Sequence, residues 1–472
     1  MQSRHSKYIV RLTHLSALAA MLSIAPWAKS AEAPLPKCDI AVEAKDPEHP
    51  NVPSSVAIDS TPQSVEATKD VVLDTPASQP VQVAQFRTPL HDAATATALA
   101  DLGLAVLKAH AEASGNAQVN RVLSPYSIAN ALALAHAGAA GETRREIASL
   151  MSSRAAGDQF FLQGLPALFT AVKMKSSNGI ASANRLWVAK SVVPALTTTF
   201  TSTVQERYGA EGSVVDFKQP SQARATINQW VADRTAGHIG SLLAEGAVSS
   251  NTRLVLTNAV FFKSAWQTPF ETRQTRPAPF HVADGKAISV PTMHDTRSVR
   301  QGVVDNITVY ELPFTGDFSL LIGLPPKGHS LDALQKDLTG VDIASWPSQL
   351  KGKTCVLSLP RWKIELPPLS LKTTLQNLGV STAFSPTADF SAALGKVGKG
   401  VQLDDALHAA TIEINETGGL ASAATAITAI SKSMAPADPP DHCAVDRPFL
   451  FAIMHRSTGA PIFFGTVAQP TI

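Results

Sequence analysis

Residues 416–436 read Glu-Thr-Gly-Gly-Leu-Ala-Ser-Ala-Ala-Thr-Ala-Ile-Thr-Ala-Ile-Ser-Lys-Ser-Met-Ala-Pro, and this stretch decides how the rest of the chain is interpreted. It lies between two apolar runs that predict strands, residues 409–415 and 449–455. A connection this long inside a compact domain is usually functional or disordered. Its first half has no proline, almost no charge and many small or β-tolerant residues. Composition alone leaves two interpretations open: a strand that lies outside any sheet, or a flexible linker of Ala, Ser and Thr.

Apolar periodicity on either side of this stretch predicts helices early in the chain and strands late. Residues 125–136 predict a helix, with Ser124 as its cap and Pro125 in its first turn. Residues 253–263 are apolar on both faces, which predicts a central strand in a covered sheet. Because helices and strands do not alternate, the expected fold class is α+β. The other expected helices are 94–110 and 227–239, and the other expected strands are 319–324, 354–365 and 461–467.

The beginning of the chain differs in composition from the rest. Residues 1–30 carry Arg4, Lys7 and Arg11, an apolar run too short to span a bilayer, and then small residues that suit cleavage. This pattern predicts a signal peptide. Residues 31–88 are rich in proline and lack helical periodicity, which predicts a disordered tether. We therefore expect residues 89–472 to form the folded domain of an exported protein, secreted or periplasmic, with no membrane span.

Charge balance and motif content argue against several classes of function. The formal net charge is +2 and no dense run of Lys or Arg occurs, so we expect no nucleic-acid partner. Motifs for a nucleophile elbow, a zinc peptidase or a phosphate loop are not found, although a scattered Ser/His/Asp triad stays open. His442 and Cys443 could be two metal ligands, but without a second pair at ligand spacing we expect no metal site. Cys38, Cys355 and Cys443 predict no disulfide framework, and their pairing stays open.

Ordered motifs decide between the two interpretations of residues 416–436. Six of them follow one another along the chain: Asn-Arg-Val-Leu-Ser-Pro-Tyr-Ser-Ile (120–128), Asn-Arg-Leu-Trp-Val (184–188), Val-Asp-Phe (215–217), Thr-Asn-Ala-Val-Phe-Phe-Lys-Ser-Ala-Trp (257–266), Glu-Thr-Gly-Gly (416–419) and Asp-Arg-Pro-Phe-Leu-Phe (446–451). Over essentially all of residues 90–472 the chain resembles the serpins, a family of serine protease inhibitors. The resemblance implies an exported, bacterial-type serpin: a monomer with three β-sheets, about nine helices and an exposed reactive-centre loop, residues 416–447, held in a metastable state.

The resemblance also implies a function, the inhibition of a trypsin-like serine protease by suicide-substrate trapping. The protease would cut the loop, form a covalent acyl complex, and be carried along as the loop inserts into the main sheet. In the family the cut follows the residue sixteen places after the hinge glutamate, here Glu416, which gives the bond Lys432–Ser433. Lysine suits a trypsin-like pocket with its buried carboxylate. The chain would then be no enzyme, with no catalytic residue and no cofactor. The alternatives are a non-inhibitory binding or chaperone protein of the same fold, and an inhibitor of a cysteine protease.

The hinge residues implied by the resemblance are small or uncharged where they must enter the sheet. Side chains alternate across a strand, so every second residue from Gly419 onward would face inward, and none of these is charged. This composition argues against the non-inhibitory alternative. The family usually has threonine or serine at the position of Gly419. The hinge set is Glu416, Gly418, Gly419, Ala421, Ala423 and Thr425.

Six further residues match positions that control the opening of the sheet in serpins. Those of the shutter would form hydrogen bonds beneath the sheet, whereas His408 alone could be an ordinary core histidine. Trp266 would lie at the breach, where the loop enters, and could also be a plain core tryptophan. Arg361 would pair with Glu416, or both could be solvated surface charges. The full set is Ser124, Ser127, Asn258, His408, Trp266 and Arg361.

Overall fold

The computed structural model describes residues 93–114, 119–151, 157–175, 179–209, 213–365, 367–419 and 440–471. Contacts within the chain divide it into residues 1–81 and 82–472, and every described residue belongs to the second unit. The expected signal peptide, the expected tether, and the loop positions Ala421, Ala423, Thr425, Lys432 and Ser433 lie outside the described residues.

The described residues contain eleven α-helices, nine of which are six residues or longer. Together with the sheets described below, they confirm the α+β class. The helices are α1 (Ala93–Ser114), α2 (Pro125–Gly138), α3 (Gly141–Ser149), α4 (Gly157–Gln159), α5 (Leu165–Lys175), α6 (Thr198–Tyr208), α7 (Pro220–Arg234), α8 (Leu331–Asp337), α9 (Gly340–Gln349), α10 (Lys372–Asn377) and α11 (Ser391–Leu394).

Local capping explains where two of these helices begin and end. Helix α2 starts as predicted, because Oγ of Ser124 accepts a hydrogen bond from the backbone N–H of Ser127 at 3.0 Å. The prediction of a helix over 227–239 was wrong in its bounds. Helix α7 begins at Pro220 and ends at Arg234, because the chain turns through the left-handed region at Ala236 and Gly237.

Nine of the described strands form the first sheet. Its order is β1-β17-β16-β9-β8-β7-β10-β15, and β6 pairs with β7. The strands are β1 (Arg121–Leu123), β17 (Ala460–Val467), β16 (Phe449–His455), β9 (Phe318–Leu324), β8 (Ile307–Pro313), β7 (Ala287–Val304), β10 (Lys351–Pro360), β15 (Asp441–Ala444) and β6 (Arg276–His281).

The second sheet has eight strands among the described residues, in the order β3-β2-β4-β13-β14-β5, with β11 and β12 on β13. All nine residues of β4 are buried, and β4 lies between β2 and β13, which confirms the expected central, covered strand. The strands are β3 (Ser213–Val215), β2 (Ile180–Ala189), β4 (Leu254–Phe262), β13 (Leu403–Asn415), β14 (Gly418–Gly419), β5 (Ser264–Ala265), β11 (Trp362–Glu365) and β12 (Leu369–Ser370).

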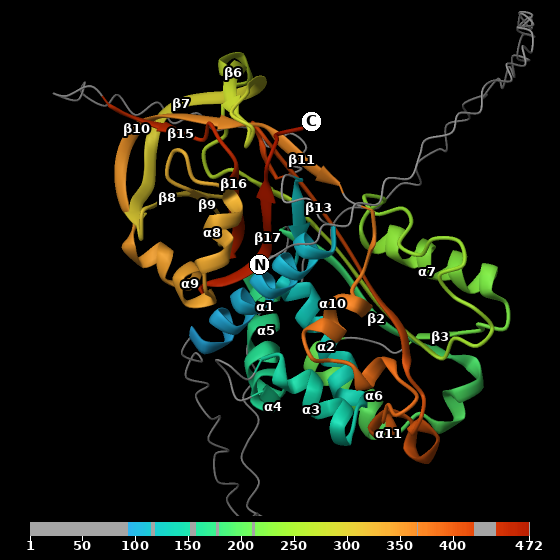
Figure 1. Cartoon of the computed structure of the whole chain (residues 1–472). Coiled ribbons are helices and arrows are strands. Elements are labelled where there is room, and N and C mark those ends of the chain that lie inside the picture. The colour runs from blue at the N-terminus through green and yellow to red at the C-terminus, as the bar shows by residue number, and fades with distance from the viewer. Residues whose placement is uncertain are drawn as a thin grey trace, which may run out of the picture. The chain divides into compact units, whose positions relative to one another are not determined.

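The long strand β7 explains why the described residues show two continuous sheets where three were expected. Its 18 residues pair with β6 and β10 along the first part and with β8 along the last part. Two strand groups that would count as separate sheets therefore share one hydrogen-bonded network. In Figure 1 the strand runs between β6 and the layer that contains β8 and β9.

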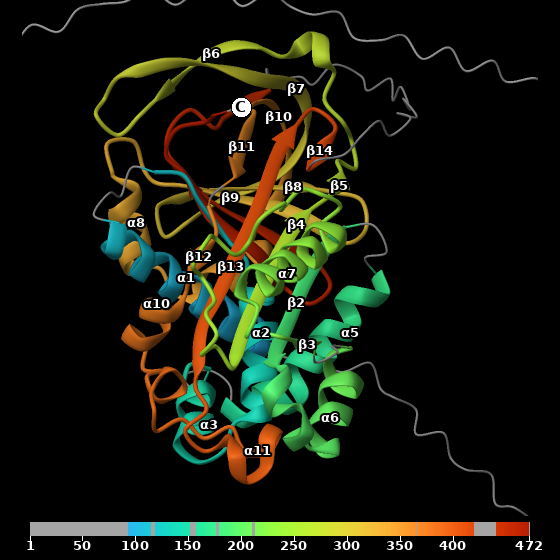
Figure 2. The same ribbon diagram turned by 90° about the vertical axis from the view of Figure 1, so that its right-hand side faces the viewer.

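Two apolar clusters hold the second sheet in place. The main core lies on one face and includes residues of α2 and of strands from both sheets, among them Ile128, Leu256 and Phe451. A smaller cluster on the opposite face includes Ile227 and Val231 of α7. Figure 2 shows α7 lying across β2, β4 and β13 on that face. The central strands are therefore covered on both sides.

Candidate functional site

The hinge, residues 416–419, turns back from the end of β13 and starts a new strand. Gly418 and Gly419 form β14, which pairs antiparallel with the last two residues of β13. The other edge of β14 pairs antiparallel with both residues of β5. The beginning of the predicted loop therefore already lies in the sheet, between β13 and β5 (Figure 2).

Two close contacts explain why both positions of β14 are glycine. Gly418 has φ +138°, and a Cβ atom there would lie 2.2 Å from the carbonyl oxygen of Ser264. A Cβ atom on Gly419 would lie 2.4 Å from ring carbon Cδ1 of Phe262. That ring is fully buried and meets three further phenylalanine rings edge to face, so it cannot move aside freely. Glycine at 419 is thus matched to Phe262.

Replacing Gly419 with threonine is expected to lower the free energy of unfolding by about 1 to 3 kcal/mol, because the new side chain overlaps the ring of Phe262. Thermal unfolding measures the effect beside the control Gly240→Thr, since a Cβ atom added at Gly240 meets only open space. The control should stay within about 0.5 kcal/mol of the wild type. Equal melting temperatures for the two variants would contradict this position of the hinge.

Glu416 is a buried carboxylate rather than a solvated surface charge. Its side chain is 8% exposed, and its Oε1 atom accepts a hydrogen bond from Oγ1 of Thr275 at 2.6 Å. Its Oε2 atom lies 3.6 Å from Nε of Arg361, whose side chain is 30% exposed. The structure therefore brings the expected pair together. Arg361 also interrupts the strand predicted over 354–365, because β10 ends before it and β11 begins after it.

Trp266 joins the main core to the hinge. Its ring stacks on Phe314 at 4.1 Å between centroids and is 2% exposed. Its indole N–H donates to the carbonyl oxygen of Asn415 at 2.8 Å, and its backbone N–H donates to that of Thr417 at 2.9 Å. Trp266 is therefore a core tryptophan that also holds the turn before β14.

A polar cluster beneath the second sheet consists of Ser124, Ser127, Asn184, Asn258 and His408. The side-chain amide of Asn258 donates to Oγ of Ser127 and to Oδ1 of Asn184, each at 2.7 Å. Oγ of Ser127 donates to the same oxygen of Asn184 at 2.9 Å. The backbone N–H of Ser124 donates to Nε2 of His408 at 3.2 Å, and Nδ1 of His408 bonds Oδ1 of Asn258. The structure thus brings together the four expected shutter residues and adds Asn184, which sequence reasoning missed although it begins one of the matching motifs.

His408 is neutral in the folded protein. Because its Nε2 atom accepts a hydrogen bond, its proton is on Nδ1, which donates to Asn258. Burial lowers the pKa of His408 from 6.5 to about 3. His408 lies opposite Asn258 in the parallel pairing of β13 with β4. We call the line between these two strands the seam, so the bond between His408 and Asn258 crosses the seam.

Acid is expected to destabilise the fold through His408. Its folded pKa is lower than its unfolded pKa, so between about pH 6.5 and pH 3 the unfolded chain binds more protons. Stability is therefore complete above that range and is lost as the pH falls, by about 2 kcal/mol from this residue between pH 6.5 and pH 5. Urea unfolding of the wild type and of His408→Gln at neutral and acidic pH isolates the effect, because other buried histidines titrate in both proteins. Equal pH dependence in both proteins would refute it.

Residues of β13 alternate between the two apolar clusters. Ile414, Ile412 and Ala410 belong to the main core, whereas Ala409 and Leu407 belong to the cluster that α7 covers. Gly419 pairs with Ile414, so its inner side faces the main core. This agrees with the inward direction expected for Gly419 from its position in the hinge.

A disulfide joins Cys355 of β10 to Cys443 of β15, with 5.8 Å between their Cα atoms. The sequence left this pairing open, because the two cysteines are 88 residues apart and meet only through the parallel pairing of β10 with β15. Closing a loop of that length lowers the entropy of the unfolded chain by an amount worth about 4 to 5 kcal/mol. Cys38 lies outside the described residues.

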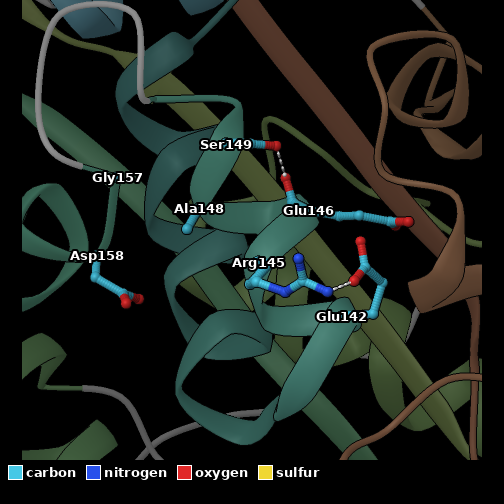
Figure 3. Close-up of a pocket in the computed structure, with 7 residues that line it drawn as sticks. All are labelled: Glu142, Arg145, Glu146, Ala148, Ser149, Gly157 and Asp158. Carbon is cyan, nitrogen blue, oxygen red and sulfur yellow. Dashed lines mark hydrogen bonds and ion pairs between the residues drawn. The ribbon is translucent and has the colours of Figure 1, made fainter.

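A surface depression of about 420 Å³ is lined by residues of α3 and α4 (Figure 3). Helix α3 and strand β14 of the hinge lie at opposite ends of β13 (Figure 2). The polar groups of the depression are already committed to structural contacts. Arg145 pairs with Glu142, and the carboxylate of Glu146 accepts hydrogen bonds from the backbone N–H groups of Ser381 and Thr382. Across the described residues no group of three or more His, Cys, Asp or Glu side chains is placed to hold a metal ion.

Known proteins resemble this chain over the residues that form the two sheets and the helices around them. A family model described as serpin (serine protease inhibitor) matches residues 97–470. Plasminogen activator inhibitor 1 of Neovison vison is 34% identical over 400 residues, which cover 81% of this chain and 94% of that protein. Antithrombin-III of Homo sapiens is 34% identical over 379 residues, which cover 77% of this chain and 79% of that protein.

A solved structure has a similar fold. Native protease nexin-1, crystallised with heparin, superposes with a TM-score of 0.69 at 28% sequence identity, covering 80% of this chain and all of that chain. The fold and the relatives point to the same family. The relatives it matches are protease inhibitors and not enzymes, and the chain belongs to the serpin (serine protease inhibitor) family.

Proposed function

We propose that this protein inhibits a trypsin-like serine protease by offering residues 416–447 as a substrate and trapping the enzyme that cuts them. The observation that carries the proposal is β14. The third and fourth positions of the loop, Gly418 and Gly419, are already a strand between β13 and β5. The residues that follow could therefore extend an existing strand, and insertion would need no new nucleus.

The register of β14 says which residues would face the core after insertion. Gly419 pairs with Ile414, so Ala421 would pair with Ile412 and Ala423 with Ala410. Thr425 would then lie opposite His408, at the polar cluster. All of these partners face inward, so the inserted side chains would be small and uncharged where the core receives them.

The proposed chemistry is an interrupted proteolysis. The serine oxygen of the protease attacks the carbonyl carbon of Lys432, and the bond to the nitrogen of Ser433 breaks. The proton of the serine hydroxyl passes through the histidine of the protease to the departing amine of Ser433. The ester that remains joins the protease to Lys432. Insertion of the cut loop along the seam would then separate His408 from Asn258, carry the enzyme away and prevent hydrolysis of the ester.

Incubation with trypsin tests the proposal, and the disulfide adds a second readout, the composition of the complex with and without reductant. A complex that survives boiling in detergent is expected. Without reductant it should contain the whole inhibitor chain, because Cys443 ties the fragment 433–472 to Cys355. With reductant that fragment should be released. Cleavage without any stable complex would favour a non-inhibitory binding protein, and a complex formed only with a cysteine protease would favour the other alternative.

We also propose that the protein is exported, monomeric and metastable before cleavage. The expected signal peptide motivates export, and a disulfide forms and persists in oxidising compartments. Among the helices of the described chain, none has the length and apolar character needed to cross a membrane. Metastability would follow because β14 has begun a strand at a place where β4 and β13 still pair directly with each other.

A further inference from the structure

We infer that the disulfide between Cys355 and Cys443 is a lock that keeps β15 on β10 and so lets the reactive loop fill the sheet only after it has been cut. This inference rests on the proposed function, because it concerns the same loop. It goes beyond it by assigning a role to a bond that links the strand after the loop to the body of the protein.

Without the disulfide, β15 is a short edge strand. It has four residues and pairs in parallel with β10, its one partner strand among the described residues. The other side-chain link between the two strands is the pair of Lys353 with Asp441, both more than half exposed, and such pairs contribute little. The two cysteines, by contrast, are fully buried. The covalent bond is therefore the strongest constraint on this strand.

Strand β15 lies near the hinge end of the seam. Its last residue, Ala444, pairs with Ser358 of β10. Three residues later in the chain Arg361 contacts Glu416 of the hinge. Both ends of the loop are therefore anchored in the same region.

Filling the sheet with an uncut loop demands more chain than a fixed β15 allows. In the register of β14, residues 419–430 would lie opposite residues 414–403 and run the length of β13, about 36 Å. Residues 431–440 would then have to return to β15 over the same distance. The eleven steps from residue 430 to residue 441 span at most about 36 to 40 Å when fully extended, and less where the three prolines among them impose a polyproline conformation. No slack remains for crossing from one sheet to the other.

Release of β15 would remove this limit. The chain is held again just after the strand, where Val445 N–H donates to the carbonyl oxygen of Ser358 at 2.9 Å and the carbonyl oxygen of Asp446 accepts from His281. Freeing residues 441–444 would therefore lengthen the return path by four residues and make uncut insertion possible. Cutting the bond after Lys432 removes the need for a return path, so the cleaved loop can insert while the disulfide stays intact.

The test compares the wild type with the double variant Cys355→Ser, Cys443→Ser. Both are incubated below their melting transitions, and samples are withdrawn to measure complex formation with trypsin. The double variant should be active when fresh and should lose activity about tenfold faster than the wild type or more. Its inactive product should be uncut by mass spectrometry and should melt higher than the fresh protein. Wild type treated with dithiothreitol, which is oxidised to its cyclic disulfide as the two cysteines become thiols, should behave like the variant.

Two further variants separate the lock from general stabilisation. Lys353→Ala removes the exposed ion pair of the same strand and should leave the rate of inactivation unchanged. Inserting about eight Gly and Ser residues after Asp438 supplies the missing chain length, so this variant should inactivate rapidly with its disulfide intact. If the double variant and the lengthened variant both keep their activity as long as the wild type, the lock does not exist.

Failure of the proposed function is distinguishable from failure of this inference. If fresh wild type forms no complex with trypsin, the proposed function fails. The lock is then still measured by the rise in melting temperature of uncut double variant and by its growing resistance to cleavage in the loop. If neither changes while the wild type does form complexes, only the lock is overturned.

Discussion

Replacing Thr425 with arginine is expected to convert the protein from an inhibitor into a substrate of trypsin. In the register of β14, Thr425 would enter the sheet opposite His408, on the face of the main core. Arginine there would place an unpaired charge beneath the sheet, at a cost of about 3 to 5 kcal/mol. Insertion would slow while the bond after Lys432 remained available. Hydrolysis of the ester should then be faster than insertion of the loop, so the variant is cut but no detergent-stable complex accumulates.

The matched control for this change is Leu420→Arg. Leu420 would pair with Glu413, which is half-buried and lies on the side of β13 opposite the main core, so the arginine would meet water and an acidic neighbour. Ala424 is a poorer control, because its partner would be Ala409, which packs in the cluster beneath α7. Densitometry of complex and cleaved bands measures both variants. If Thr425→Arg and Leu420→Arg trap trypsin equally well, the register or the insertion mechanism is wrong.

Replacing Lys432 with glutamate is expected to reduce the rate of complex formation with trypsin by about a thousandfold or more, because the pocket of trypsin carries a buried carboxylate and would repel a second one. The fold should be unaffected, since we expect the residue to belong to the reactive-centre loop. Rate constants for complex formation with wild type, Lys432→Arg and Lys432→Glu measure the effect.

A control with the same change of charge is Lys327→Glu, since Lys327 is exposed in the turn before α8. It should trap trypsin at the wild-type rate, as should Lys432→Arg. Mass spectrometry of the cleaved protein locates the cut. A cut at another bond, together with full inhibition by Lys432→Glu, would show that counting from Glu416 misplaces the reactive bond.

Local patterns predicted the parts of the fold that local chemistry determines. Helix α2 could be predicted because Ser124 and Pro125 are a cap and a first-turn residue, and β4 because seven of its nine residues are apolar. Strand β7 was missed, because most of its side chains are partly or fully exposed, half of its residues are polar and it shows no simple alternation. The bounds of α7 were missed because its end depends on positive φ at Ala236, a residue with no preference for that conformation.

In the candidate site, too, a sequence motif located single residues, whereas contacts between distant segments could not be predicted. The hinge motif located Glu416 and the glycines after it, but the two-residue strand they form depends on Phe262 and on β5, which are distant in sequence. The disulfide left no signal in the sequence, because β10 and β15 become neighbours only when the first sheet has formed. Asn184 was missed for a similar reason, since its partners Ser127 and Asn258 come from α2 and β4.

The central claim is that the cut loop continues β14 along the seam between β4 and β13. A crystal structure of the trypsin-cleaved protein tests it most directly. That structure should contain a new strand between β4 and β13 with Ala423 opposite Ala410, Thr425 opposite His408, and the bond between His408 and Asn258 broken. The cleaved protein should also melt higher than the intact one. A cleaved protein in which β4 and β13 remain paired, with His408 still bonded to Asn258 and residues 420–432 outside the sheet, would contradict the account.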